Sequence, residues 1–309
     1  MNTKVIKGKI KSTGSIKKIT RTMEMVSVAK MKKAVGLADG YKLFGIEAKK
    51  ITHVLADQRE KHALTIKNTY NKKSEEIKEI LIVLVAGQKG LCGGYNSNLY
   101  RYIYKNYALE KSNLRFITIG KYAEKIAKKF DINAGIEKES INILAAFSGK
   151  EFTNSDARVI TKKIILEYTE AKYKEVKLIY TDFTNVNTQS VTQNTLLPFS
   201  NETVKEKDLL GNEGNKKENL GDDLEYTFEP NINEVFEYIV NILIQNIISG
   251  SVLRARAAEH AARMMAMKTA TDNAGEMLKE LKTYFNKARQ AAITQEIAEI
   301  SSGAMASGK

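Results

Sequence analysis

The stretch LKELKTYFNKARQAAITQEIAEI, residues 278–300, decides the fold of this chain. Its apolar residues recur at spacings of three, four, three and four, at Leu278, Leu281, Phe285, Ala288 and Ala292. Such spacing is typical of a helix that packs lengthwise on a partner helix. A neighbouring apolar stripe begins at Ile293, Ile297 and Ile300. The stretch therefore predicts a helix that needs a second helix beside it.

The predicted helix is long, because no proline follows Pro230 before the chain ends at Lys309. Residues 230–309 as one helix would span on the order of 110 Å. Small residues in its middle would let a partner helix approach closely, at Ala257, Ala258, Ala261, Ala262, Ala266, Ala270 and Ala274. Because glycine disfavours a helix interior by roughly 1 kcal/mol relative to alanine, we expect a break or bend at Gly250–Ser251.

Residues 1–60 are predicted to provide the partner helix. Apolar residues recur there at mostly helical spacing, at Ile6, Ile10, Ile16, Ile19, Met23 and Val26, and again at Ile51, Val54 and Leu55. A helix of this length, on the order of 80 Å, could lie antiparallel along much of the C-terminal one. We expect breaks or bends near Gly36–Gly45 for the same reason as at Gly250. The alternative is an ordinary helical bundle.

Between the two helices, residues 75–205 alternate apolar β-rich runs with amphipathic stretches. The predicted strands are Ile80–Val85, Phe116–Ile119, Val176–Tyr180 and Val191–Leu197, and the predicted helices are Asn98–Tyr107, Lys121–Phe130 and Asp156–Ala171. Alternating strands and helices favour an open, Rossmann-like α/β sheet. Residues 206–229 are expected to form a polar loop and an edge segment. The predicted fold class is α/β, with a long antiparallel coiled coil of the terminal helices.

The turn after the first predicted strand, AGQKGLCGGYN at residues 86–96, is rich in glycine. A P-loop would need a Gly-Lys-Ser/Thr sequence where Cys92 stands, and the dinucleotide fingerprint would need glycine at Lys89 and Cys92. We therefore predict a tight strand-to-helix turn that requires glycine backbone angles. A nucleotide-binding α/β enzyme is the alternative, and it would bind nucleotide near residues 87–94.

Residues suited to catalysis or metal binding are sparse and scattered. His53, His62 and His260 lie far apart in the sequence and fit neither a metal-ligand nor a catalytic-triad spacing. Cys92 is the only cysteine, so a disulfide within the chain is excluded. We expect no catalytic residue, no metal and no cofactor.

Positive charge is concentrated near the start of the chain. The net charge is +13, and residues 1–33 hold ten lysine or arginine residues against one acidic residue, Glu24. A basic helix of this kind suits phosphate backbones, acidic lipids or an acidic protein sleeve. Nucleic-acid binding, with an affinity that falls steeply with salt, remains an alternative, although the basic stretch has no aromatic residue for stacking.

Membrane insertion is not expected. The longest apolar run, Val235–Ile248, is interrupted by Glu237, Asn241, Gln245 and Asn246, and spanning helices need about 20 apolar residues. The basic N-terminus has no apolar block behind it, so we expect no signal peptide and a soluble, cytoplasmic protein.

Three separated groups of residues resemble one known family. They are IKKITRTMEMV at 16–26, GLCGG at 90–94, and EHAARMMAMK at 259–268 with NKARQAAIT at 286–294. In this order they resemble the gamma subunit of F-type ATP synthase, over essentially the whole chain. The resemblance implies a coiled coil inside a ring of three alpha and three beta subunits, and an α/β foot below it.

The resemblance also implies a function and partners. Rotation of the coiled coil would couple ion flow through the membrane c-ring to ATP synthesis or hydrolysis at the alpha and beta subunits, and the chain itself would be non-catalytic. The epsilon subunit would be a further partner. The implied location is the cytoplasmic face of a bacterial membrane, held peripherally.

Six residues are carried over from the family by position. Met23, Arg289 and Gln290 match positions that meet the beta subunit, and Tyr226, Phe228 and Glu229 match a stretch at the foot, near the membrane ring. Arg254, Arg256 and Ala258 depart from the family, which more often has an acidic or neutral residue and a serine there.

Overall fold

The computed structural model describes residues 3–61, 79–107, 114–133, 143–148, 151–170, 172–198 and 228–308. The chain divides into two compact units. The helical unit comprises residues 1–29 and 263–309, and the α/β unit comprises residues 30–262. Each unit is described by itself below.

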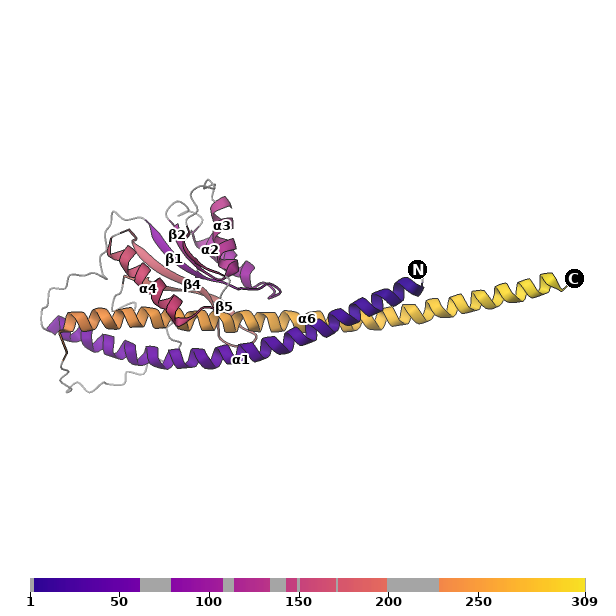
Figure 1. Ribbon diagram of the computed structural model, residues 1–309, viewed down its shortest axis with the longest axis horizontal. Helices are drawn as coiled ribbons and strands as arrows, with labels where there is room; N and C mark the ends of the chain where they lie inside the picture. Colours follow the sequence, from indigo (N-terminus) through magenta and orange to yellow (C-terminus); the bar gives the residue numbers. More distant parts are fainter. Residues whose placement is uncertain are drawn as a thin grey trace. The chain divides into compact units, whose positions relative to one another are not determined.

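The described residues form five strands and five helices, two of them long (Figure 1). Four of the strands and the three shorter helices lie close to their predicted positions. In chain order they are α1 (Thr3–Lys61), β1 (Ile80–Val85), α2 (Tyr95–Tyr107), β2 (Leu114–Ile119), α3 (Lys121–Asn133), β3 (Ile143–Phe147), α4 (Asn154–Thr169), β4 (Glu175–Phe183), β5 (Gln189–Leu197) and α6 (Ile232–Ser307). Strand β3 was not predicted. The predicted residues 206–227 lie outside the described residues.

Both long helices are continuous, so no break occurs at the glycines where breaks or bends were predicted. A methyl group added at Gly36 or Gly40 would meet nothing within 4 Å, so these glycines sit in ordinary helix. Gly250 has a different role, because a β-carbon there would lie 3.3 Å from Cβ of Tyr41. Glycine at this position permits α1 and α6 to approach closely within the α/β unit, and the packing offsets its low helix propensity.

The α/β unit contains one sheet with strand order β3-β2-β1-β4-β5. Strands β1 to β4 run parallel to one another, whereas β5 runs antiparallel to β4. All six residues of β1 are buried, which explains why its sequence, ILIVLV, is a continuous apolar run. The sheet is thus covered on both faces.

The two faces are covered by different helices. Leu99 and Ile103 of α2 and Ala127 and Phe130 of α3 pack with Ile82 and its neighbours on one face. On the other face, α4 and the part of α6 that belongs to this unit pack against alternate strand residues, among them Leu81, Val83, Ile160, Ile244 and Ile248. The predicted α/β fold class is confirmed, and α6 is a core helix of the α/β unit.

In the helical unit, α1 and α6 run antiparallel along a seam of small polar residues. The Thr271 hydroxyl lies 2.7 Å from Oγ1 of Thr20, and Thr13 Oγ1 lies 3.8 Å from Sδ of Met277. The buried residues of α1 here are seven apart, at Ile6, Thr13, Thr20 and Ser27, which is the period of a coiled coil. The predicted antiparallel pair is therefore present in this unit.

The predicted apolar seam of α1 is wrong for four of its residues. Ile16, Ile19 and Val26 are exposed, by 51%, 59% and 49% of their surface, and Ile51, in the part of α1 that belongs to the α/β unit, is exposed by 47%. Small hydroxyl residues occupy the seam instead, because their size lets the backbones approach and their hydroxyls bond to helix carbonyls, as Ser27 does to the Met23 carbonyl at 2.7 Å. On α6 the predicted seam is half-buried, at Leu278, Leu281, Phe285, Ala288 and Ala292.

Candidate coupling surfaces

The glycine-rich turn is bound to α6 within the α/β unit. The Gln88 amide donates to a carboxylate oxygen of Glu259 at 3.3 Å, and the Tyr95 hydroxyl donates to the Ala255 carbonyl at 3.0 Å. Cys92 and Tyr95 are buried against Ala258. The turn therefore joins the sheet to the long helix.

Glycine is required where this turn passes the next strand. Gly120 has a φ of 99°, and a β-carbon there would lie 2.2 Å from the Ala86 carbonyl oxygen. Gly93 also has a positive φ, of 56°. Glycine adopts such angles without strain, and Leu91 takes a φ of 60° in the same turn. The predicted need for glycine angles is therefore confirmed at Gly93, whereas Leu91 shows that the turn also places a larger residue at a positive φ. A phosphate at this turn would face the Glu259 carboxylate, which argues against the nucleotide-binding alternative.

A second link between the sheet and α6 is the ion pair of Arg254 with Asp182. Arg254 Nε lies 2.5 Å from one carboxylate oxygen of Asp182, and Nη2 lies 2.6 Å from the other. This two-point geometry is the strong form of an arginine–carboxylate contact. Arg256, two residues on, reaches only Glu151, at 3.6 Å, and the Phe152 carbonyl. Arg254 and Arg256 thus have partners within this chain.

Next to this ion pair lies a buried tyrosine. Tyr180 of β4 is 1% exposed, and burial raises the pKa of its hydroxyl, while hydrogen bonds with Ser251 and Asn194 act in the opposite direction. The hydroxyl therefore stays neutral at physiological pH. Apolar packing and an ion pair together fix α6 on the sheet.

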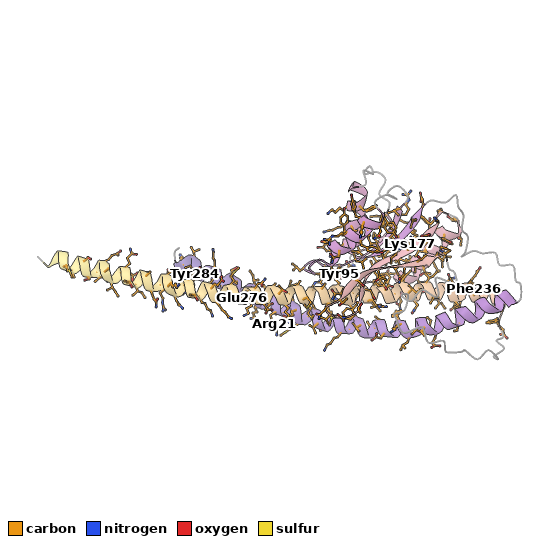
Figure 2. All side chains as sticks on the ribbon, turned by 180° about the vertical axis from the view of Figure 1, so that it is seen from behind. Arg21, Tyr95, Lys177, Phe236, Glu276 and Tyr284 are labelled. Atoms are coloured by element: carbon orange, nitrogen blue, oxygen red, sulfur yellow. The ribbon has the colours of Figure 1, made fainter. Side chains whose placement is uncertain are left out.

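The surface of the helical unit is basic and partly apolar. Every lysine and arginine of α1 in this unit is exposed, at Lys4, Lys7, Lys9, Lys11, Lys17, Lys18 and Arg21. Arg21 pairs with Glu24 at 3.0 Å. A hollow of about 610 Å³ lies beside these cations, and its lining combines the stems of Lys17, Lys18 and Arg21 with Met25 and Thr271. Figure 2 shows Arg21 on α1 and Glu276 and Tyr284 on α6.

The predicted coupling residues lie on this surface. Met23 is half-buried, whereas Arg289 and Gln290 are exposed on α6. Further along α6, Ile297 and Ile300 are 62% and 72% exposed. Large aliphatic side chains at helical spacing are an unusual solvent-facing surface for a helix. The structure brings Arg289 and Gln290 together on one helix, and it does not place them beside Met23.

The predicted foot residues precede α6. Phe228 is half-buried and Glu229 is exposed, while Tyr226 lies outside the described residues. Asn231 begins the helix, since its side-chain oxygen accepts the Glu234 amide at 3.0 Å and its amide nitrogen donates to the Glu234 carboxylate at 2.6 Å. This reciprocal cap fixes the start of α6 just after Phe228 and Glu229.

Sequence reasoning missed Asp182 as a partner of α6, and it noted Glu259 only as part of a family motif and not as a partner of the turn. Their partners are 72 and 171 residues away in the sequence, so no local pattern marks these contacts. Among the described residues, no group of three His, Cys, Asp or Glu side chains is placed to hold a metal ion.

One described helix, α6, is long and apolar enough to pass a composition test for a membrane span, with a mean hydropathy of 1.4 over 18 residues. Half of that window is buried inside the protein. Core helices of soluble proteins pass the same test, and the packing of Ile244 and Ile248 on the sheet accounts for the apolar composition here.

Comparisons with known proteins agree over nearly the full length. The family model for ATP synthase matches residues 2–306. The ATP synthase gamma chain of Ruthia magnifica is 33% identical over 307 residues, which cover 98% of both chains. That of Heliobacterium modesticaldum is 32% identical over 303 residues, again with 98% of both chains covered.

Solved structures show the same fold. A chain of the Euglena gracilis mitochondrial ATP synthase matches with a TM-score of 0.61 and 17% identity, over 98% of this chain and 94% of that one. A chain of the central stalk and c-ring structure from Tetrahymena thermophila matches with a TM-score of 0.58 and 20% identity, over 82% of this chain and 99% of that one. The full-length family match and the relatives above 30% identity establish that this chain belongs to the ATP synthase gamma-chain family, a constituent of an enzyme complex.

Proposed function

We propose that this chain is the central rotor shaft of an F1Fo ATP synthase. In this role it couples ion-driven rotation of the membrane c-ring to ATP synthesis or hydrolysis at sites on the alpha and beta subunits. The observation that carries the proposal is the outward surface of the helical unit, where exposed isoleucines and a dense row of cations surround a thin seam. Such a surface suits a protein sleeve that covers it.

The mechanism requires a surface that differs from side to side. Cations of α1 lie on part of the helical unit, and the stripe of Ile293, Ile297 and Ile300 lies on α6. At any moment, three beta subunits around such a shaft would each contact a different set of side chains. Because each contact favours one conformation of the beta subunit over another, rotation would shift the ATP affinity of the three sites in turn. The chain itself would make and break no bonds.

Individual residues have distinct proposed roles. The Arg289 guanidinium and the Gln290 amide would donate hydrogen bonds to carboxylates or carbonyls of a beta subunit. Met23 would slide past a changing beta surface, because its thioether is flexible and polarisable. Residues 1–60 and 230–309 would form the shaft and residues 75–205 the foot, with Tyr226, Phe228 and Glu229 facing the c-ring.

The proposed partners are three alpha and three beta subunits, the epsilon subunit and the c-ring. The chain would be held peripherally at the cytoplasmic face of a bacterial membrane through these partners, without inserting into the lipid. It would bind no cofactor. By setting the conformation of the beta subunits, it would also regulate ATPase activity and ion flow.

Reconstitution tests the proposal. The full chain, mixed with purified alpha and beta subunits, should form a complex with one copy of this chain and hydrolyse ATP much faster than alpha and beta alone. A chain truncated after Met277 should give poor activity, because it lacks Arg289, Gln290 and the isoleucine stripe. Failure of the full chain to form any complex would refute the rotor proposal.

A paired variant locates the coupling contact more finely. Arg289→Ala with Gln290→Ala should lower the rate of ATP hydrolysis by about tenfold, which corresponds to the loss of one charge-assisted contact in a coupled step. Lys268→Ala with Thr269→Ala is the matched control on the same helix, since both residues are exposed. Equal rates for the two double variants would show that Arg289 and Gln290 do not couple.

A further inference from the structure

A second basic surface lies on the α/β unit, on the outer side of α2 and α3. We call it the lysine–tyrosine face and define it by Tyr100, Arg101, Lys105, Lys121, Lys125 and Lys129. All of these side chains are exposed except that of Tyr100, which is half-buried. The two helices pack together on one face of the sheet, so their outer side chains form a continuous surface.

The tyrosines of this face are held in place. Tyr100 and Tyr122 pack against the buried core on one side, and Tyr100 stacks on Tyr104 with 6.1 Å between ring centroids. Lys129 of α3 lies 4.6 Å from the Tyr100 ring centroid, and Lys125 lies 4.9 Å from that of Tyr122. The cation–π contact of Lys129 with Tyr100 links the two helices, and it orders an ammonium group without neutralising it.

Positive charges on this face are arranged against helix stability. Arg101 and Lys105, Lys121 and Lys125, and Lys125 and Lys129 are like-charged pairs four residues apart. Each such pair destabilises a helix by about 0.2 to 0.5 kcal/mol. Only Lys128 has an acidic partner at this spacing among the described side chains of α2 and α3, Glu124 at 2.6 Å, and this bond lowers the pKa of Glu124. Lys125 and Lys129 contact tyrosine rings, and these contacts leave their positive charges without a carboxylate among the ion pairs described for α2 and α3.

We propose that the lysine–tyrosine face is a docking surface for an acidic segment of another protein subunit. Carboxylates complement ammonium and guanidinium groups, and phenol hydroxyls at the rim add hydrogen-bond donors. The fixed rings give a carboxylate-bearing segment a rigid surface to bind, which lowers the entropy lost on binding.

The observations favour protein over nucleic acid and lipid. Two of the tyrosine rings are covered by lysine ammonium groups, so they are not open for bases to stack on. Among the described residues of α2 and α3, Tyr104 is the one large apolar side chain that is well exposed, so the face has no aliphatic wedge for a membrane. The inference rests on the proposed function, because that function puts the chain among other subunits.

Cross-linking in the intact complex tests the inference. A carbodiimide joins amines to carboxylates in direct contact, so the purified ATP synthase treated with it should yield peptides that join Lys121, Lys125 or Lys129 to an aspartate or glutamate of another subunit. The absence of any such peptide from these three lysines, with other intersubunit cross-links present, would overturn the inference.

A matched pair of variants gives a quantitative test. Lys125→Gln with Lys129→Gln removes two charges from the face, and Arg158→Gln with Lys162→Gln removes two exposed charges from α4 on the opposite face of the sheet. The first pair should weaken retention of the cross-linked subunit in moderate salt by about fivefold, as expected for two partly exposed ion pairs. The α4 pair should leave retention unchanged. Equal retention in both would overturn the inference.

The isolated chain separates this inference from the rotor proposal. If no complex forms, the rotor proposal fails, and binding of fluorescent decaglutamate to the isolated chain then decides the docking surface. Binding must weaken in Lys125→Gln with Lys129→Gln and stay unchanged in the α4 pair. Vesicles containing phosphatidylglycerol serve as the rival probe, and binding to them that depends on Lys125 and Lys129 would overturn the protein assignment.

Discussion

Isoleucines near the two ends of α6 have opposite surroundings. Ile244 and Ile248 are fully buried between α6 and the sheet in the α/β unit, whereas Ile297 and Ile300 of the helical unit are largely exposed. The residue type and the helix are the same in both places. The difference teaches that the α/β unit completes its own core, while the helical unit presents exposed apolar surface of the kind found at binding sites.

The seams differ in the same way. In the α/β unit, α6 is fixed by apolar packing and by the ion pair of Arg254 with Asp182. In the helical unit, α1 and α6 meet through threonine hydroxyls, at Thr20 with Thr271 and at Thr13 with Met277. Because burial of apolar surface is the main source of stability, we expect the α/β unit to be stable alone and the helical unit to gain order in a complex.

Replacing an isoleucine on each part of α6 gives the largest expected difference. Ile244→Ala leaves a cavity in a packed core and should destabilise the α/β unit by about 3 kcal/mol. Ile297→Ala should change stability by less than about 0.5 kcal/mol, because the side chain is exposed. Urea unfolding followed by circular dichroism measures both. Similar losses for the two variants would mean that Ile297 is buried in the isolated chain.

Replacing a glycine in each unit by alanine should change stability in opposite directions. Gly120→Ala forces a β-carbon onto the Ala86 carbonyl at a positive φ and should destabilise the α/β unit by about 2 kcal/mol. Gly14→Ala, in α1 of the helical unit, meets nothing within 4 Å and should stabilise that helix by about 0.5 to 1 kcal/mol. Thermal unfolding tests both signs, and a stabilised Gly120→Ala variant would contradict the turn geometry.

The carboxylates paired with Arg254 and Arg256 of α6 should contribute differently to the stability of the α/β unit. Asp182→Ala removes a partner that is 16% exposed and should destabilise the α/β unit by about 1 to 2 kcal/mol. Glu151→Ala removes one that is 88% exposed, and its effect should stay below about 0.5 kcal/mol. A double-mutant cycle with Arg254→Met isolates the pair energy, and a coupling near zero would show that this ion pair does not hold α6.

The polar seam of the helical unit should give the smallest effect. Thr271→Val removes the hydroxyl that lies between Thr20 and the Met267 carbonyl and should destabilise the seam by about 1 kcal/mol. Thr283→Val is the control, because Thr283 is exposed and bonds only within its own helix in the contacts described. Hydrogen exchange of the α1 amides should quicken in the first variant alone. Unchanged exchange would argue that packing and not this hydroxyl holds the seam.

Sequence patterns predicted the elements well where one physical signal dominated. The run ILIVLV fits a strand buried on both faces, and β1 has the predicted bounds, Ile80–Val85. Strand β3, Ile143–Phe147, was missed because it is a short edge strand, half-buried, with two alanines in its middle. The four remaining strands carried enough β-branched or aromatic residues to be recognised.

The seam between α1 and α6 was mispredicted because the spacing of apolar residues does not show where threonine or serine side chains are buried between helices. Ile16, Ile19 and Val26 looked like a core stripe, yet Thr13 and Thr20 are the buried residues. Long-range partners such as Asp182 for Arg254 could not be read at all, since only the fold brings them together. Met23, Arg289 and Gln290 came from the family resemblance, and their roles stay predictions.

The central claim is that the helical unit is completed by other subunits and the α/β unit is not. Hydrogen–deuterium exchange of the isolated chain, compared with the chain reconstituted with alpha and beta subunits, tests it most directly. The account predicts that amides around Ile293–Ile300 exchange rapidly alone and become strongly protected in the complex, while those around Ile244 and Ile248 are protected in both. Equal protection of residues 293–300 in the two states would contradict the account.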